Sequence, residues 1–471
     1  MPSINWPWAI VLCRFNDVAV VPKPREYYVD LYTVGGSGGL PDYWRAVTCN
    51  SIDITNSQVF GWFAMTHPAS DVSRLVFPGD RHQLVQWGRD AAAANGVDLT
   101  PFRQVLIVQN YGVDHGAAGN GIVVVHSNPD LCEFGFICHE MGHGFGLPHS
   151  CAANPDTVYG DGWDVMSFAK TTFQFPIVFK GTAGAATVGL NARNLKALGA
   201  VPPGRTWRQS TRDFSTEITL DPLNQPPIGN HGYLVAEVAL GGNTYTVEFR
   251  RKAGWDRGIP EESVSVREIR PDGLSYLYPS EGARFTAGQQ CVIPGLKTYL
   301  RVSAMTNEAA TLRIWDLPDG SLRKEDSKPK VYLIKGDSKR WVTSPAVLFA
   351  LGRSWADVRS VPDGALTQVP DGPDVNLQSV TVSPHPTPLN QLTSVTVTSV
   401  DLSTGSSLQG DVIIDGRQVG TTGTAFDRTF KTKRKLIPGT YPREWEIIFP
   451  RGIVRVPGYP DADIDFSFPD Q

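Results

Sequence analysis

A dense histidine motif lies in the first third of the chain and reads His139-Glu140-Met141-Gly142-His143-Gly144-Phe145-Gly146-Leu147-Pro148-His149. Two histidines at positions i and i+4 of a helix differ by about 40° of rotation, so their side chains lie on one face. Both imidazoles can then reach one zinc ion at about 2.0–2.1 Å. Glu140 follows the first histidine and projects beside the pair, where a carboxylate suits a general base toward water at the metal.

The residues before the motif predict the helix that carries it. Asn128 is a candidate N-cap, Pro129 fits a first helical turn, and Asp130 suits the positive end of the helix dipole. An apolar stripe at three- and four-residue steps would anchor this helix in the core, and it consists of Leu131, Phe134, Cys138, Met141 and Phe145.

Gly146 stands where this helix should end, because a glycine adopts the left-handed conformation that turns the chain. That turn would return His149 as a third ligand and leave a fourth position for water, as in catalytic zinc sites. The alternative is three unrelated histidines with local hydrogen bonds. Chance produces the two-histidine core in roughly one such chain in a hundred, and the added Gly and His lower this to the order of one in 10^4–10^5. The pattern therefore favours a metal site.

A segment from Tyr159 to Ser167 carries a methionine, Met166, at 17 residues after His149 (166 − 149). With this segment the chain resembles the metzincin metallopeptidases, whose long zinc motif is followed by a turn with a methionine beneath the metal. The resemblance implies that the three motif histidines bind one catalytic Zn²⁺, that Glu140 is the base, and that Met166 forms the turn. An ordinary core methionine is the alternative for Met166.

Within the metzincins, the closer resemblance is to secreted bacterial peptidases of the immune-inhibitor and gametolysin-like type. It rests on residues 139–149, 160–167, 191–199 and the β-rich stretch 244–260, and it covers about the first 315 residues. Many immune-inhibitor-like members have Asp as third ligand, where this chain has a histidine. The resemblance implies an extracellular location and protein or glycoprotein substrates.

The resemblance also implies a role for the strand that precedes the motif. In metzincins this strand lines the cleft and pairs with an extended substrate, in the manner of strand addition. In this chain the predicted substrate-binding strand comprises Gly121, Ile122, Val123, Val124 and Val125.

Charge and hydropathy exclude other classes of protein. The 471 residues carry 43 Lys and Arg against 47 Asp and Glu, and the formal net charge of −4 gives no basic field for a nucleic-acid partner. No run reaches the ~18 apolar residues of a membrane span. The start of the chain, residues 1–7, has neither the basic region nor the long apolar region of a signal peptide. Nothing in the sequence indicates an oligomeric state.

The fold class predicted is multi-domain α+β, in four domains. Residues 1–205 alternate strand and helix patterns and form the metzincin-like α/β catalytic domain. Period-2 alternation over residues 206–318 predicts a β-sandwich. After a charged linker at 323–330, residues 328–374 form a small α/β module, and residues 376–471 resemble an immunoglobulin-like β-sandwich.

Local signals add several elements to this division. Residues 80–95 predict a helix that ends at Gly96, and residues 191–198 predict a short helix before Gly199. Asp415-Gly416 after an apolar run predicts a β-hairpin.

Carboxylates and cysteines near the motif have alternative interpretations. Asp156, Asp161 and Asp164 would suit Ca²⁺, but their spacing lacks the alternation of a calcium loop, so turn chemistry is the better account and calcium has no support. Cys132 and Cys151 flank the motif and form either a disulfide or two free buried thiols.

Two further histidines receive no metal role. His115 belongs to a glycine-rich loop that either approaches the cleft or, as we favour, lies at the surface. His126 ends the predicted substrate-binding strand and is interpreted as a surface histidine.

The sequence predicts a zinc-dependent endopeptidase that hydrolyses protein peptide bonds through a metal-activated water, with Glu140 as general base. The alternative is an adhesion or glycan- or protein-binding multi-domain protein with a dormant peptidase-like domain. Intact ligands and an intact base argue against the dormant site.

Overall fold

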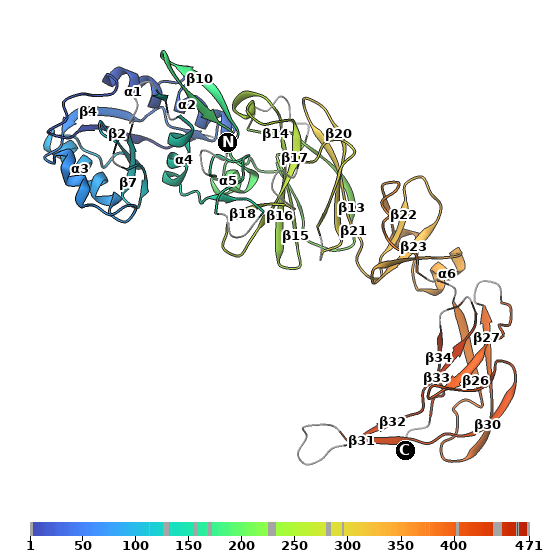
Figure 1. Ribbon diagram of the computed structural model, residues 1–471. Coiled ribbons are helices and arrows are strands. Elements are labelled where there is room, and N and C mark those ends of the chain that lie inside the picture. Colours follow the sequence, from blue (N-terminus) through green and yellow to red (C-terminus); the bar gives the residue numbers. More distant parts are fainter. Residues whose placement is uncertain are drawn as a thin grey trace. The chain divides into compact units, whose positions relative to one another are not determined.

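The computed structural model describes residues 3–112, 114–125, 131–132, 134–153, 158–167, 172–224, 232–278, 284–293, 296–372, 374–375, 377–401, 405–436, 445–457, 459 and 461–468. The chain forms two compact units: unit 1 is Met1–Arg212 with Thr216–Ile314, and unit 2 is Asp213–Ser215 with Trp315–Gln471. Figure 1 shows many strands in separate sheets and few helices, in agreement with the predicted α+β class. Among the described residues, no helix has the length and apolarity needed to cross a membrane.

A five-stranded sheet organises the first part of unit 1. Its strand order is β4-β2-β5-β7-β6. The neighbours from β4 to β7 pair in parallel, and β6 pairs antiparallel with β7 at one edge. The bounds are β2 (Trp8–Arg14), β4 (Gln58–Ala64), β5 (Gln104–Gln109), β6 (Gly116–Ala118) and β7 (Gly121–Val125).

Helices cover both faces of this sheet, so its central strand β2 is apolar and buried from Trp8 to Cys13. Alternate residues of β2 point to opposite faces. Trp8 and Ile10 belong to a core that also contains residues of α1, α2 and α4. Ala9 and Val11 belong to a core with α3, which confirms the helix predicted at residues 80–95. These helices are α1 (Arg25–Tyr32), α2 (Leu40–Val47), α3 (Arg81–Ala94) and α4 (Phe134–Gly144).

Shorter elements complete this part of unit 1. Strands β8, β10 and β11 form a sheet in the order β10-β11-β8, and β1 pairs with β3. The side chain of Asn191 caps α5 by accepting a hydrogen bond from the Asn194 amide, as the predicted helix at 191–198 requires. The bounds are β1 (Ile4–Asn5), β3 (Ile52–Asp53), η1 (Ala69–Arg74), β8 (Leu131–Cys132), β10 (Gln174–Phe179), β11 (Thr182–Thr187) and α5 (Ala192–Ala197).

The second part of unit 1 contains a seven-stranded sheet with one unexpected member. Its order is β12-β15-β16-β17-β18-β9, with β14 paired to β16. Strand β9 comes from the chain directly after His149, whereas the others follow residue 205. The bounds are β9 (Ser150–Cys151), β12 (Thr206–Gln209), β14 (Pro222–Leu223), β15 (Val235–Leu240), β16 (Asn243–Arg250), β17 (Ser263–Ile269) and β18 (Ser275–Tyr278).

A four-stranded sheet in the order β13-β21-β20-β19 follows the same region of the sequence. A single 3-10 turn, η2, separates β16 from β17. The bounds are β13 (Ser215–Leu220), η2 (Gly254–Asp256), β19 (Gln290–Ile293), β20 (Thr298–Met305) and β21 (Ala310–Asp316). The predicted strand-rich region after residue 206 thus consists of two sheets.

Unit 2 also consists mainly of small sheets. One has the order β24-β23-β22-β25, and the sheets β26-β27-β30 and β29-β28-β33-β34 share one hydrophobic core. The bounds are β22 (Leu322–Glu325), β23 (Val331–Lys335), β24 (Ser338–Trp341), α6 (Pro345–Ala350), η3 (Trp355–Asp357), β25 (Val358–Val361), β26 (Gln378–Ser383), β27 (Leu392–Asp401), β28 (Asp411–Ile414), β29 (Arg417–Thr421), β30 (Ala425–Thr429), β31 (Lys433–Leu436), β32 (Trp445–Ile448), β33 (Gly452–Arg455) and β34 (Ala462–Ile464).

Two local predictions for unit 2 have opposite outcomes. Asp415 and Gly416 join β28 to β29 with positive φ angles of 51° and 77°, which confirms the hairpin. The charged stretch 323–330 is wrong as a solvated linker, because Arg323 lies in β22 and is fully buried. Its guanidinium pairs with Asp213 at 2.7 Å and with Asp316 at 3.2 Å.

Candidate metal centre

Helix α4 carries the first two motif histidines and begins later than predicted. Its first residue is Phe134, whereas Leu131 lies in β8 and pairs with Ala183 of β11. The prediction that Leu131 belongs to the apolar stripe of this helix is therefore wrong. Its backbone pairs with β11 as a strand and does not form the first turn of α4. The predicted capping residues at 128–130 fall outside the described residues.

The turn after α4 has the geometry expected from Gly146. This glycine has a φ of 85°, and its amide donates to the His143 carbonyl at 2.9 Å. The Leu147 amide donates to the Gly142 carbonyl at 3.0 Å. These two bonds are those of a Schellman motif, in which a left-handed residue ends the helix and reverses the chain. The reversal brings His149 back toward the helix.

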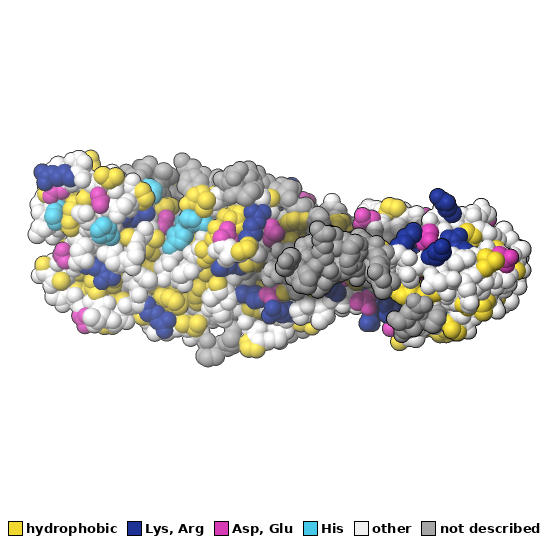
Figure 2. Space-filling view, turned by 90° about the horizontal axis from the view of Figure 1, so that it is seen from below, with side chains coloured by type: hydrophobic (Ala, Val, Ile, Leu, Met, Phe, Trp, Pro, Cys, Tyr) yellow, Lys and Arg dark blue, Asp and Glu magenta, His cyan; other side chains and the backbone are white. Residues whose placement is uncertain are grey.

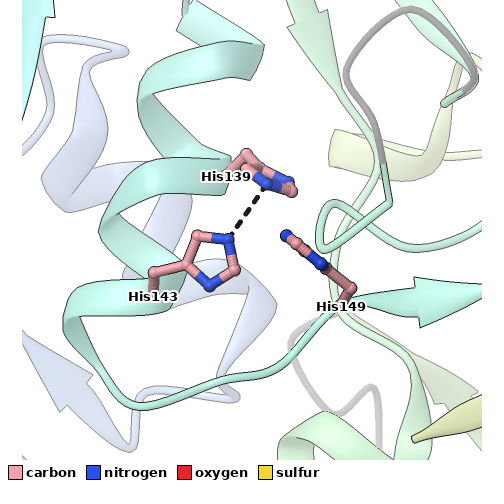
Figure 3. Close-up of side chains that lie close together, drawn as sticks. All are labelled: His139, His143 and His149. Atoms are coloured by element: carbon pink, nitrogen blue, oxygen red, sulfur yellow. Dashed lines mark hydrogen bonds between the residues drawn. The ribbon is translucent and has the colours of Figure 1, made fainter. Parts of the chain in front are cut away.

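The three motif histidines lie together and point toward one another, as Figure 3 shows. Their ligand nitrogens lie within 4.8 Å of one another. The Nε2 atoms of His139 and His143 are 3.2 Å apart. Two ligands of a tetrahedral zinc ion, each at about 2.05 Å, are about 3.3 Å apart. The predicted ligand set is therefore assembled in the fold.

Hydrogen bonds orient two of these rings. His139 Nδ1 lies 2.8 Å from the Val165 carbonyl oxygen, and His143 Nδ1 lies 2.9 Å from that of Leu147. A carbonyl oxygen only accepts, so each Nδ1 carries the proton and each Nε2 presents a lone pair. Two lone pairs that face each other at this distance repel unless a cation lies between them. The donor set thus fits a metal ion.

The surroundings keep all three rings neutral. Burial lowers the pKa of His139 to about 4, with further lowering by His143 and His149. Burial also lowers the pKa of His149 to about 4, and it lowers the pKa of His143. Neutral imidazole is the form that binds a metal, so the site is ready for one at neutral pH.

Met166 packs against helix α4 at Gly142, and it belongs to the segment that is predicted to form the methionine turn. Its side chain is fully buried. A Cβ added to Gly142, which lies between the two helical histidines, would be 2.2 Å from Met166 Sδ. The glycine within the motif therefore makes room for the methionine, and Met166 packs against the turn of α4 that presents the ligands.

Glu140 is buried next to the histidines. Burial raises the pKa of its carboxyl to about 7, against lowering by Arg81 and by a hydrogen bond from the Ala117 amide. Its Oε2 atom is buried and has no hydrogen-bond partner among the described residues. A buried carboxyl with an open acceptor and a pKa near neutrality can take up a proton and release it again.

The metal centre opens into a pocket of about 690 Å³. Figure 2 shows one face of the molecule, on which histidine side chains (cyan) reach the surface among hydrophobic side chains (yellow). The pocket is lined by Arg81, Asp114, His115, Ala117, Ala118, Gly119, Phe136, His139, Glu140, His143, His149 and Tyr159. The exposed His115 thus lines the pocket, where its ring packs on Phe136 with centroids 4.5 Å apart.

The predicted substrate-binding strand Gly121–Val125 is β7, and its outer edge is already paired. β6 pairs with Gly121, Ile122 and Val123 on one side, while β5 pairs with residues from Ile122 to Val125 on the other. The prediction is therefore wrong for Gly121–Val123, because an interior strand has no free backbone groups for a substrate. The edge strand next to the pocket is β6.

Three polar pocket residues, Arg81, Asp114 and Tyr159, received no role from the sequence. Arg81 pairs with Asp114 at 2.5 Å, and its Nη1 donates to the Ala117 carbonyl at 3.2 Å. The hydroxyl of Tyr159 lies 3.3 Å from His149 Nε2. None of these residues belongs to a recognisable motif. For Tyr159, its position at the start of the segment that contains Met166 was the one feature of the sequence that could have placed it near the site.

The structure decides between the alternative interpretations for Asp161, Asp164 and Cys151. Asp161 and Asp164 are buried and accept amide hydrogen bonds from Trp163 at 3.0 Å and Met166 at 2.9 Å, which confirms turn chemistry. Cys151 is a free buried thiol, so it forms no disulfide. Asp156, His126 and the Cys132 side chain lie outside the described residues.

Comparisons with known proteins do not assign this chain to a family. No protein-family model matches the chain, and no curated protein matches it. Among solved structures, the chain is similar to wild-type OgpA from Akkermansia muciniphila, with 13% identity and a TM-score of 0.30. The match covers 64% of this chain and 88% of that one. A likeness at this level decides nothing about activity.

Proposed function

We propose that this protein is a zinc-dependent endopeptidase of the metzincin type, which hydrolyses peptide bonds in protein or glycoprotein substrates. The observation that carries the proposal is the convergence of His139, His143 and His149, with ligand atoms within 4.8 Å, beside the buried Glu140. Three histidines around a position that opens into a pocket fit a catalytic zinc site, whereas closed four-ligand sites are structural.

The histidines would hold the ion through Nε2 of His139 and His143 and through a ring nitrogen of His149. When bound, zinc supplies Lewis-acid chemistry: it polarises the scissile carbonyl and lowers the pKa of water to about 7. The carbonyl oxygens of Val165 and Leu147 keep the rings of His139 and His143 in the orientation and tautomer that this requires.

Glu140 moves the proton in the proposed reaction. Its carboxylate accepts a proton from the attacking water as the water oxygen bonds to the scissile carbon. The same carboxyl then donates that proton to the leaving amine nitrogen as the carbon–nitrogen bond breaks. In the metal-free protein, burial raises the pKa of this carboxyl to about 7, which shows that its surroundings admit both the charged and the neutral form.

Strand β6 is the best candidate to hold an extended substrate. In its antiparallel pairing with β7, both backbone groups of Ala117 point away from β7, since the amide donates to Glu140 and the carbonyl accepts from Arg81. A substrate strand that pairs with this edge would have to take the place of Glu140 and Arg81 on the two Ala117 groups, and it would then be aligned beside Glu140. In this proposal, β6 takes the substrate-binding role that the sequence predicted for β7.

The test compares the native protein with Glu140→Gln in digestion of an unfolded general substrate, with and without a zinc chelator. We expect the native protein to cleave, the chelator to abolish cleavage, and the variant to bind zinc but cleave at least about 10²-fold more slowly. Turnover of Glu140→Gln at the native rate would refute Glu140 as the base. A native protein that binds zinc and cleaves no protein would instead favour the dormant-site alternative.

A further inference from the structure

A cluster of fully buried charges joins the methionine turn to the seven-stranded sheet. Arg267 of β17 donates to Asp161 at 2.7 Å, and it also pairs with Glu248 of β16 at 2.7 Å. Arg250 of β16 pairs with the same Glu248 at 3.1 Å and with Asp256 of η2 at 2.6 Å. Each of these side chains is at most 1% exposed. Asp161 and Arg267 are 106 residues apart in the chain.

From Asp161, hydrogen bonds lead to the first ligand. Asp161 begins the turn that contains Met166, and its carboxylate accepts from the Trp163 amide. Arg250 donates to the Trp163 carbonyl at 2.6 Å. The carbonyl of Val165 in this turn accepts from His139 Nδ1. Arg250 directly, and Arg267 through Asp161, thus hold the backbone of Trp163, two residues before the carbonyl that orients His139.

The same sheet also holds the chain at the third ligand. Ser150 and Cys151, which directly follow His149, form β9 and pair in parallel with Ser275 and Tyr276 of β18. The Ser150 amide donates to the Met166 carbonyl at 3.1 Å. The residue after the third ligand is therefore bonded to both the sheet and the methionine turn.

Buried ion pairs of this kind are poor stabilisers, because the cost of removing the charges from water often exceeds their attraction. Well-packed apolar residues would fill the same space with less desolvation. A bidentate guanidinium does what an apolar side chain cannot, since its planar fork imposes one orientation on the carboxylate that it binds. The cluster is therefore better explained by the geometry it imposes than by added stability.

We propose that Arg267 is a positioning residue for the metal centre: through Asp161 it fixes the turn whose Val165 carbonyl orients His139 and whose Met166 carbonyl holds the strand after His149. The sheet that follows residue 205 is then part of the metal site and not an accessory to it. The inference rests on the proposed function only in that it takes the three histidines as metal ligands.

The experiment uses the full chain and three variants: Arg267→Met, Asp161→Asn and Arg267→Lys. Zinc affinity is measured by competition with a chelator, and ligand geometry by the visible absorption of the Co²⁺-loaded protein. Because disturbed outer-shell partners typically cost 10–100-fold in metal affinity, we expect Arg267→Met to lose at least about tenfold and to change the Co²⁺ spectrum. Arg267→Lys should recover only part of both, since an ammonium lacks the fork.

Arg323→Met is the matched control. Arg323 is also fully buried and pairs with a fully buried carboxylate, Asp316, but it belongs to unit 2. It should lower thermal stability and leave zinc affinity and the Co²⁺ spectrum as in the native protein. A folded Arg267→Met with native zinc affinity and spectrum would overturn the proposal. If that variant fails to fold, Asp161→Asn, which preserves the shape of the side chain, decides by the same two readouts.

A metal-free readout separates this inference from the proposed function. Hydrogen exchange of the apo-protein should be faster in residues 158–167 and 150–151 of Arg267→Met than of the native chain, and unchanged in Arg323→Met. Unchanged exchange in Arg267→Met would overturn positioning even if the enzyme cleaves protein. Conversely, a native protein that binds zinc with the expected geometry but cleaves nothing would end the proposed function and leave the positioning role intact.

Discussion

Tyr159 brings a phenolic hydroxyl to the edge of the metal site, 3.3 Å from His149 Nε2 and on the wall of the pocket. Burial, together with the charge of Glu140, raises the pKa of its hydroxyl, so Tyr159 remains a hydrogen-bond donor at neutral pH. A donor at this place is suited to the negative charge that develops on the scissile carbonyl oxygen. In the proposed reaction we therefore expect Tyr159 to act in the transition state more than in substrate binding.

Tyr159→Phe tests this role because it removes the hydroxyl alone. We expect zinc content and KM close to native and kcat lower by about 10²–10³-fold, the usual loss for one donor of this kind. Steady-state kinetics on a short peptide substrate give both parameters. An unchanged kcat would show that the hydroxyl does not contact the reacting carbonyl.

The lowered pKa values of the three histidines predict how zinc bound there, as proposed, would respond to acid. Only a protonated imidazole competes with a metal, and the pKa values of His139 and His149 are lowered to about 4. As the pH falls, zinc should stay bound through the ordinary histidine range near 6.5 and leave only toward about pH 4. Equilibrium dialysis over this range measures the release.

Glu140→Gln is the control for this measurement, because it removes a carboxyl that lines the same pocket and whose pKa is raised to about 7. Its release curve should fall in the same acidic range as that of the native protein. A midpoint near pH 6.5 in both proteins would mean that burial does not protect the imidazoles from protonation.

At the scale of elements, α4 uses glycine where close packing demands it. A Cβ at Gly142 would lie 2.2 Å from Met166 Sδ, and a Cβ at Gly144 would lie 2.2 Å from the Trp8 ring. Glycine is a poor helix former, about 1 kcal/mol worse than alanine. The helix therefore depends on tertiary packing, and its close approach to Met166 and to β2 places the ligands.

Gly142→Ala measures whether the gain in helix propensity or the clash of the added methyl group with Met166 has the larger effect on stability. Helix propensity alone predicts a gain of about 1 kcal/mol. The clash with Met166 predicts a loss of about 1–3 kcal/mol, as for overpacked cores, and we expect this loss to dominate. Thermal or denaturant unfolding of the metal-free protein gives the sign.

The double variant Gly142→Ala/Met166→Ala provides the control for that prediction. Without the methionine sulfur, the added methyl group has space, so the double variant should be more stable than the sum of the two single changes indicates. If the changes in the free energy of unfolding are strictly additive, the added methyl group at residue 142 does not clash with Met166.

The elements near the motif also show how far a sequence predicts such a site. The i, i+4 histidines, the left-handed glycine and the methionine are local patterns, and the structure assembles the residues that they named. The edge strand β6 was missed because Gly116–Ala118 is too short and lacks the large apolar residues that predict a strand. An edge position is also a property of sheet order, which no run of residues encodes alone.

For the whole molecule, the division predicted at residue 205 separates groups that the structure joins. The predicted catalytic domain and most of the predicted second domain lie within one compact unit. Asp161 meets Arg267, and the Ala192 amide donates to Glu248 at 2.6 Å. Nothing in the sequence around Asp161 or Arg267 signals these contacts, because each is a charged residue whose burial depends on its distant partner. Periodicity identifies where the elements change, but not which of them share a site.

This arrangement predicts different fates for two truncated proteins. A chain that ends at residue 205 loses β17 and β18, so Asp161 would be a buried carboxylate without its guanidinium and β9 would lose its partner strand. Loss of one partner of a buried ion pair typically costs 3–5 kcal/mol. We expect this fragment to fail to fold or to bind zinc much more weakly than the full chain.

A chain that ends at residue 318 keeps every contact of the metal centre named above and removes most of unit 2. It should bind zinc like the full chain and cleave short peptides at a similar rate, while cleavage of large proteins falls if unit 2 holds substrate. Zinc titration and parallel assays on a peptide and a protein compare the fragments. Full zinc affinity in the fragment that ends at residue 205 would contradict this prediction. It would show that the first 205 residues build the site alone and that the sheet from β12 to β18 contributes nothing to its geometry.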